Sequence, residues 1–144
     1  MTTVHFQTVN GQWVAVDFGQ ENNPLVANRS GIGSWGAFEM TESNNGALVD
    51  GASVNLKAAN GLYVCAEKGG GGELVANMST LGLWETFTLK RAAGNGSLVT
   101  GDQIALQAAN GQFVCAERGG GQILVANRSA LGPWEKFGIK FPVT

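Results

Sequence analysis

Three tryptophans recur at nearly equal steps along this chain of 144 residues. Trp35, Trp84 and Trp134 each stand in a glycine-containing turn, three residues ahead of a phenylalanine in the next expected strand. An aromatic side chain in a loop on a rigid scaffold is well placed for binding. An indole face can stack on the C–H surface of a pyranose ring while its N–H reaches a hydroxyl. The tryptophans are therefore candidate stacking platforms, with core packing as the alternative.

Carboxylates accompany the tryptophans at two positions of the repeated pattern. The position at the end of a short strand holds Asp17, Glu67 and Glu117, and the position after each tryptophan holds Gly36, Glu85 and Glu135. A charged acceptor forms strong hydrogen bonds with hydroxyl donors. The alternatives are a solvated charge or a cap on the neighbouring turn. The predicted binding residues are Asp17, Trp35, Glu67, Trp84, Glu85, Glu117, Trp134 and Glu135.

The rest of the chain repeats in step with these residues. Asn-Gly pairs begin at Asn10, Asn60 and Asn110, and Leu-Val-Ala-Asn runs begin at Leu25, Leu74 and Leu124. A fixed period near 50 residues indicates structural repeats. We place them at residues 1–48, 49–98 and 99–144 of one domain. The first repeat has one extra residue between Asp17 and Leu25.

Each repeat alternates apolar and polar residues with period two, which is typical of strands. In the third repeat Ile104 and Leu106 alternate with polar residues, and Asn110-Gly111 predicts a tight hairpin turn. Val114 and Ala116 should face the core, with Phe113, Cys115 and Glu117 facing away. The pattern gives four strands per repeat. Such a repeat cannot bury its apolar face alone, and three blades are too few for a propeller. We therefore predict an all-β fold, a β-trefoil with pseudo-threefold symmetry.

The composition fits a globular β protein and narrows the range of partners. The chain has 44% hydrophobic residues, 22 glycines and a net charge of −2. It has no lysine or arginine cluster, so we expect neither nucleic acid nor an anionic membrane as partner. No run of 18 apolar residues and no signal peptide is present. If the natural protein is secreted, its leader has been removed or lies upstream.

Metal, nucleotide and catalytic chemistry are not expected. Cys65 and Cys115 occupy equivalent positions in two repeats, which predicts free thiols, and His5 is the only histidine, so we expect no metal and no cofactor. Gly31 to Gly36 match a dinucleotide fingerprint only literally, because no strand, turn and helix unit is expected there. Three shallow, near-identical sites do not provide the single deep pocket of an enzyme. We therefore predict a non-catalytic binder.

The segment NGQFVCAERGGGQILVANRSALGPWEKF resembles the fascin-like β-trefoil repeat. Its Leu-Val-Ala-Asn-Arg and Gly-x-Trp-Glu-x-Phe motifs are more similar to those of carbohydrate-binding module family 92, which is found on bacterial polysaccharide-degrading enzymes. The resemblance covers essentially the whole chain and implies a trivalent β-glucan binder with a tryptophan and an acidic residue at each site. It also implies an extracellular module, attached in a longer chain to a glycoside hydrolase, and we expect a monomer.

Several alternatives remain open. The linkage could be β-1,3 or β-1,6, and a galactose-type lectin fits the same residues. A fascin-like, actin-associated protein interaction module is the alternative from another class, although this single acidic domain lacks the joined trefoils and basic patches of fascins. In the first repeat Asp17 and Gly36 depart from the pattern of the other two. These departures put the activity of that site in doubt.

Overall fold

The computed structural model describes residues 2–18, 23–43, 46–91 and 98–141, and they form an all-β protein, as predicted. Each repeat contributes four strands. The first contains β1 (Thr2–Gln7), β2 (Trp13–Val16), β3 (Leu25–Arg29) and β4 (Phe38–Glu42). The second contains β5 (Ser53–Lys57), β6 (Tyr63–Ala66), β7 (Leu74–Met78) and β8 (Phe87–Arg91). The third contains β9 (Gln103–Gln107), β10 (Phe113–Ala116), β11 (Leu124–Arg128) and β12 (Phe137–Lys140).

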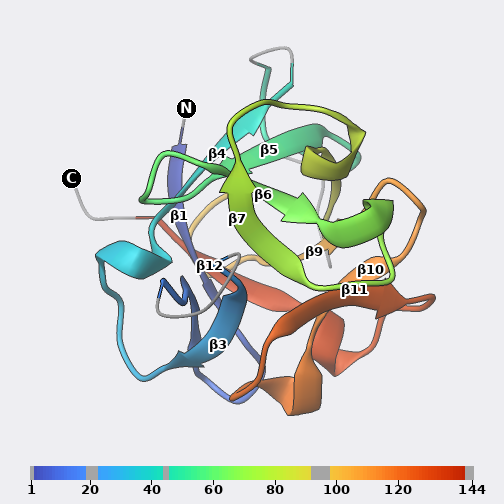
Figure 1. The fold of residues 1–144 in the computed structure, drawn as a ribbon. Coiled ribbons are helices and arrows are strands. Elements are labelled where there is room, and N and C mark those ends of the chain that lie inside the picture. The colour runs from blue at the N-terminus through green and yellow to red at the C-terminus, as the bar shows by residue number, and fades with distance from the viewer. Residues whose placement is uncertain (1, 19–22, 44–45, 92–97, 142–144) are drawn as a thin grey trace.

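The first and last strands of each repeat close together into a barrel. β1 pairs with β12 and β4, β4 with β5, β5 with β8, β8 with β9, and β9 with β12, all antiparallel. The second and third strands of each repeat form a hairpin, which pairs β2 with β3, β6 with β7 and β10 with β11. Figure 1 shows β3, β7 and β11 arranged around a common centre, one from each repeat. A barrel capped by three hairpins is a β-trefoil, so the predicted fold is confirmed.

The Asn-Gly pairs form the hairpin turns that the sequence predicts. Gly111, between β9 and β10, has a φ of 91°, in the left-handed region that glycine enters without steric cost. Its N–H donates to the carbonyl of Ala108 at 2.9 Å, and the side-chain oxygen of Asn110 accepts the N–H of Gln112 at 2.9 Å. These bonds fix the hairpin that leads into β10.

Three phenylalanines fill the centre of the core. Phe38, Phe87 and Phe137 begin β4, β8 and β12, and their exposed fractions are 0%, 0% and 1%. The ring of Phe6 lies 5.7 Å from that of Phe38 and 6.3 Å from that of Phe137, so the aromatic side chains of different strands pack together. The inward alternation predicted for the last strand of each repeat is thereby confirmed.

Short 3-10 turns connect the strands where the predicted site residues lie. η1 (Ser34–Gly36), η3 (Leu83–Glu85) and η5 (Pro133–Glu135) precede the last strand of each repeat, and η2 (Glu67–Gly69) and η4 (Glu117–Gly119) follow β6 and β10. Within the described residues no helix is long and apolar enough to cross a membrane. Because η1 leads into strand β4, Gly31 to Gly36 do not form a dinucleotide loop.

Candidate functional site

The three tryptophans lie on the surface, at corresponding places in the three repeats. Trp35, Trp84 and Trp134 are 51%, 45% and 40% exposed, and they belong to η1, η3 and η5. The phenylalanines that follow them fill the core, so the indoles are not needed there. A half-exposed aromatic side chain contributes only part of the free energy that its full burial would give. The expected surface position of the tryptophans is confirmed, while their role in binding stays a prediction.

Glycine loops hold two of these indoles in place. A Cβ added to Gly69 would lie 3.0 Å from Nε1 of Trp84, and one added to Gly119 would lie 3.2 Å from Nε1 of Trp134. Both glycines have positive φ, 75° and 76°. The pyrrole edge of each indole therefore lies directly against a glycine. A side chain at that glycine would displace the indole.

The neighbouring repeat completes each of these two loops. The N–H of Asn110 donates to the carbonyl of Gly69 at 2.9 Å, and the N–H of Asn10 donates to that of Gly119 at 3.2 Å. The side chains of Asn110 and Asn10 also occupy the space where a Cβ on Gly70 or Gly120 would lie. A site at Trp84 or Trp134 is thus built from two repeats, a contact that the repeat pattern in the sequence does not reveal.

Glu67 and Glu117 lie where the glycine loops begin, and both are half-buried. Oε1 of Glu117 lies 2.8 Å from Nη2 of Arg128, in an ion pair that is partly exposed. Such pairs contribute about 0–1 kcal/mol, so a ligand can compete for the carboxylate. The second repeat has Met78 in place of Arg128 and cannot form this pair. The carboxylates of Glu67 and Glu117 therefore differ in their surroundings, although the sequence pattern treats them as equivalent.

Glu85 and Glu135, predicted as ligand-facing carboxylates, are instead buried, with exposed fractions of 4% and 5%. Oε1 of Glu135 accepts the N–H of Gly132 at 2.6 Å, and Oε2 lies 3.9 Å from Nε of Arg128. The carboxylate of Glu135 therefore folds back over its own 3-10 turn, because the unpaired N–H groups there require an acceptor. Glu85 and Glu135 are therefore structural residues of their turns and do not face a ligand.

Two cysteine thiols also contact these carboxylates, Cys65 at Glu85 and Cys115 at Glu135. Cys65 and Cys115 are free and buried, and the prediction of free thiols is confirmed. The pKa of each thiol is raised to about 12, first by burial and then by a hydrogen bond to Glu85 or Glu135. Each thiol therefore stays protonated and donates to the glutamate. Cys115 was expected to face away from the core, and it is nevertheless fully buried, next to Glu135 of η5.

Glu135→Ala should lower the stability of the fold. The change leaves the N–H of Gly132 and the thiol of Cys115 without an acceptor, so we expect the free energy of unfolding to fall by about 1–3 kcal/mol in urea denaturation. Glu135→Gln keeps one acceptor oxygen and should recover part of the loss. An unchanged urea midpoint for Glu135→Ala would contradict the scaffold role described above.

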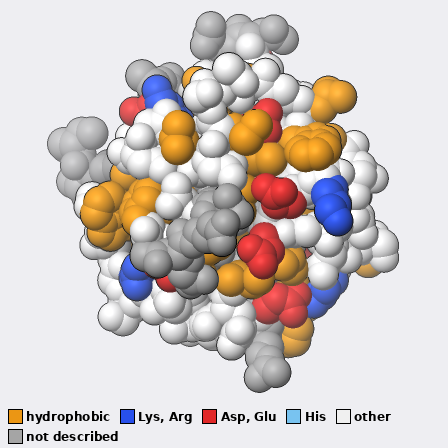
Figure 2. All heavy atoms as spheres, viewed as in Figure 1, with side chains coloured by type: hydrophobic (Ala, Val, Ile, Leu, Met, Phe, Trp, Pro, Cys, Tyr) orange, Lys and Arg blue, Asp and Glu red, His pale blue; other side chains and the backbone are white. Residues whose placement is uncertain are grey.

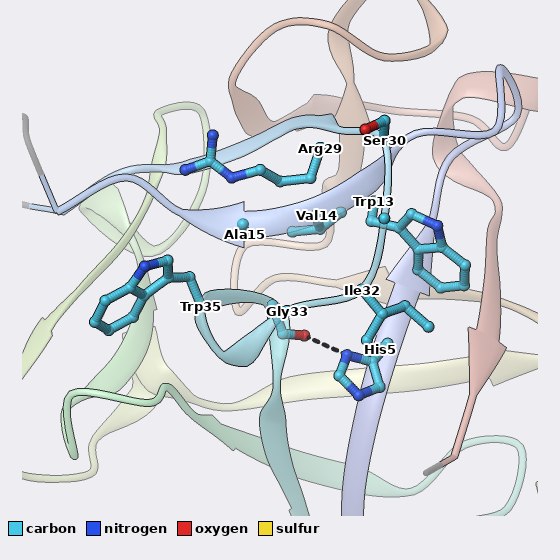
Figure 3. Close-up of a pocket in the computed structure, with 11 residues that line it drawn as sticks. His5, Trp13, Val14, Ala15, Arg29, Ser30, Ile32, Gly33 and Trp35 are labelled. Carbon is cyan, nitrogen blue, oxygen red and sulfur yellow. Dashed lines mark hydrogen bonds between the residues drawn. The ribbon is translucent and has the colours of Figure 1, made fainter. Parts of the chain in front are cut away.

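The first repeat has a pocket of about 370 Å³ in the corresponding region. Gly36 and Ala15 stand there in place of the glutamate and cysteine of the other repeats. Figure 3 shows Arg29 and Trp35 on one side of Ala15, with His5, Trp13 and Ile32 on the other. Nδ1 of His5 lies 3.0 Å from the carbonyl oxygen of Gly36 and donates to it. Trp35 was predicted from the sequence and Arg29 was considered only as an optional polar contact, whereas no role at a site was predicted for His5 or Trp13.

His5 should make stability depend on pH. Burial lowers the pKa of His5 below its usual 6.5, the bond to Gly36 opposes this change, and the charge of Lys140 supports it. Since the unfolded chain then binds a proton more readily, the free energy of unfolding should fall as pH drops below about 6.5.

The matched variant is His5→Asn, because Asn55 occupies this position in the second repeat and donates to the carbonyl of Glu85 at 3.0 Å. The variant should keep the hydrogen bond and lose the pH dependence in urea titrations between about pH 5 and pH 8. Equal pH dependence in both proteins would show that His5 is not the titrating group.

Asp17, the remaining predicted site residue, is half-buried just after β2. The loop that follows includes residues 19–22, which lie outside the described residues, and the extra residue predicted between Asp17 and Leu25 falls in this loop. Asp17 therefore keeps the sequence position of Glu67 and Glu117, with a side chain one methylene shorter.

On the face shown in Figure 2, hydrophobic side chains form separate small groups, acidic side chains gather near the centre, and lysine and arginine side chains lie singly toward the edges. Among the described residues no group of three or more His, Cys, Asp or Glu side chains could hold a metal ion. Apolar contacts on this face are thus available at several separate places.

The fold and these features define the chain as a β-trefoil with three related surface positions. No protein-family model matches it, and no curated protein matches it significantly. Among solved structures it is similar to the designed threefold symmetric protein ThreeFoil, with 12% identity, a TM-score of 0.74, and coverage of 98% of this chain and 99% of that one.

Two natural proteins share the fold. The SDF2-like protein from Arabidopsis thaliana has 10% identity and a TM-score of 0.76, with 99% of this chain and 96% of that chain covered. A mosquitocidal holotoxin has 9% identity and a TM-score of 0.73, with 97% of this chain matching 16% of that one. At these identities the likeness supports the fold alone.

Proposed function

We propose that this chain is a non-catalytic carbohydrate-binding module that binds β-glucan, β-1,3- or β-1,6-linked, through up to three shallow sites. The observation that carries the proposal is the exposure of Trp35, Trp84 and Trp134 on equivalent 3-10 turns, while a phenylalanine fills the core behind each of them. Exposed indoles on rigid turns bind pyranose rings through their faces. The resemblance to carbohydrate-binding module family 92 points to the same ligand class.

Glu67 and Glu117 are the carboxylates best placed to add polar recognition. Both are half-buried at the start of glycine loops that contact the indoles of Trp84 and Trp134. A carboxylate there orients a sugar by accepting hydrogen bonds from its hydroxyls, which stacking alone cannot do. A shallow site of this kind has millimolar to micromolar affinity, roughly −4 to −8 kcal/mol.

A binding role fits this arrangement better than catalysis. A glycosidase needs two carboxyl groups that flank the scissile bond with separated pKa values. Here Glu85 and Glu135, which stand next to Trp84 and Trp134 in sequence, are buried and bonded within their own turns or to a thiol. The proposal therefore includes no catalytic residue. It places the module outside the cell as a monomer, joined in a longer chain to a glycoside hydrolase.

The test is a pull-down on insoluble β-1,3-glucan and β-1,6-glucan, with a galactan and actin filaments as parallel arms. We expect retention on a β-glucan and none on filaments. Retention on galactan alone would replace the proposal with a galactose-type lectin. Sedimentation with filaments and no retention on any glycan would replace it with a fascin-like interaction module.

A further inference from the structure

The first repeat differs from the other two by paired changes at neighbouring positions. The second and third repeats fill the space behind the turn with a glutamate and a cysteine, Glu85 with Cys65 and Glu135 with Cys115. The first repeat has the two small residues Gly36 and Ala15, and both line its pocket. The first repeat therefore lacks a buried carboxylate and has a cavity where the others have side chains.

The backbone in the first repeat has adapted to this change. A Cβ added to Gly36 would lie 2.7 Å from the carbonyl oxygen of Val14, which is closer than real contacts allow. The turn η1 thus approaches strand β2 too closely to accept a side chain at this position. The pocket volume of about 370 Å³ is within the range of ligand sites, roughly 300–1,000 Å³. The cavity is large enough for a sugar ring.

The charge of the pocket also differs from that of its counterparts. In the third repeat Arg128 contacts two carboxylates, Glu117 at 2.8 Å and Glu135 at 3.9 Å. The equivalent Arg29 is exposed, lines the pocket, and forms no ion pair within residues 2–18, 23–43, 46–91 and 98–141. Lys140 adds a second positive charge near the pocket, because it lies opposite His5 in the pairing of β1 with β12.

We propose that the first repeat binds an acidic sugar, a hexuronic acid residue of a polysaccharide, with its carboxylate on Arg29 and its ring on Trp35. Figure 3 shows these two side chains on the same side of the pocket. An arginine binds a carboxylate through two parallel hydrogen bonds to a charged acceptor, whereas a neutral sugar offers only uncharged and weaker acceptors. The inference rests on the proposed carbohydrate binding and assigns the first repeat a ligand of its own.

The test uses the indole N–H signals of the four tryptophans as separate reporters in NMR titrations. The probes are methyl β-D-glucuronide and methyl β-D-glucoside. In the unmodified protein the glucuronide should shift the Trp35 signal at lower concentration than the glucoside, and added NaCl should weaken this preference.

The decisive variant is Arg29→Met, which introduces the residue that the second repeat has at Met78. It should reduce glucuronide affinity at Trp35 by roughly tenfold and abolish the preference. Lys90→Met, on β8, removes one positive charge elsewhere and should leave the preference intact. Equal affinity for both probes at Trp35, or a preference that survives in Arg29→Met or in high salt, overturns the inference.

The titrations also separate this inference from the proposed function. If β-glucan oligosaccharides shift the signals of Trp84 and Trp134 while Trp35 shows no preference for glucuronide, the uronic acid site is rejected and carbohydrate binding stands. If no sugar shifts any of the four signals, both proposals are rejected.

Discussion

The protein should bind polymeric β-glucan about 10²–10⁴-fold more tightly than it binds the corresponding monosaccharide. Each tryptophan site is shallow and its own affinity is low, because one indole face and one carboxylate bury little of a sugar. Exposed indoles in all three repeats allow several contacts with one polysaccharide chain or surface. Once one site is occupied, the others bind at a high effective concentration.

Isothermal titration with the monosaccharide and depletion binding with the polymer measure the two affinities. The comparison is made per mole of sugar unit, so that the polymer has no advantage from its number of units alone. Equal affinity for both forms would show that the sites act independently or that only one of them binds.

Phe137→Ala should mainly lower stability, whereas Trp134→Ala should mainly weaken binding, although the two residues are only three positions apart. Phe137 is 1% exposed and belongs to the core, whereas Trp134 is 40% exposed. Truncating a buried phenylalanine typically costs about 3–5 kcal/mol, because transfer energy is lost and a cavity remains. We expect that loss for Phe137→Ala and a change below about 1 kcal/mol for Trp134→Ala.

Urea denaturation measures the stability of both variants, and glucan retention is then measured under conditions in which each remains folded. Folded Phe137→Ala should still bind, whereas Trp134→Ala should bind more weakly. If Trp134→Ala were as destabilising as Phe137→Ala, the indole would belong to the core and the site would be misassigned.

The β-trefoil could be predicted because its evidence is periodic. Repeated Asn-Gly pairs and period-two alternation fix hairpins and core-facing residues locally, and three copies require a closed arrangement. The exposure of Trp134 followed from the same logic, since Phe137 already begins the inward alternation. These features depend on neighbours in sequence, which a single chain displays directly.

The direction of side chains after a turn could not be predicted in this way. Glu135 follows Trp134 in sequence, yet its carboxylate folds back to the N–H of Gly132 because η5 has unpaired donors. The contact of Asn10 with Gly119 joins the first and third repeats and depends on how the barrel closes. Gly36 appeared in the sequence as a missing carboxylate, whereas the structure shows that it opens a pocket beside Arg29.

The most direct test of the central claim is retention on insoluble β-glucan by three single variants, Trp35→Ala, Trp84→Ala and Trp134→Ala, and by the double variant of Trp84 and Trp134. Circular dichroism establishes that each variant is folded. The account predicts that Trp84→Ala and Trp134→Ala each reduce retention more than Trp35→Ala, and that the double variant loses roughly 10²-fold. Full retention by the folded double variant would contradict it.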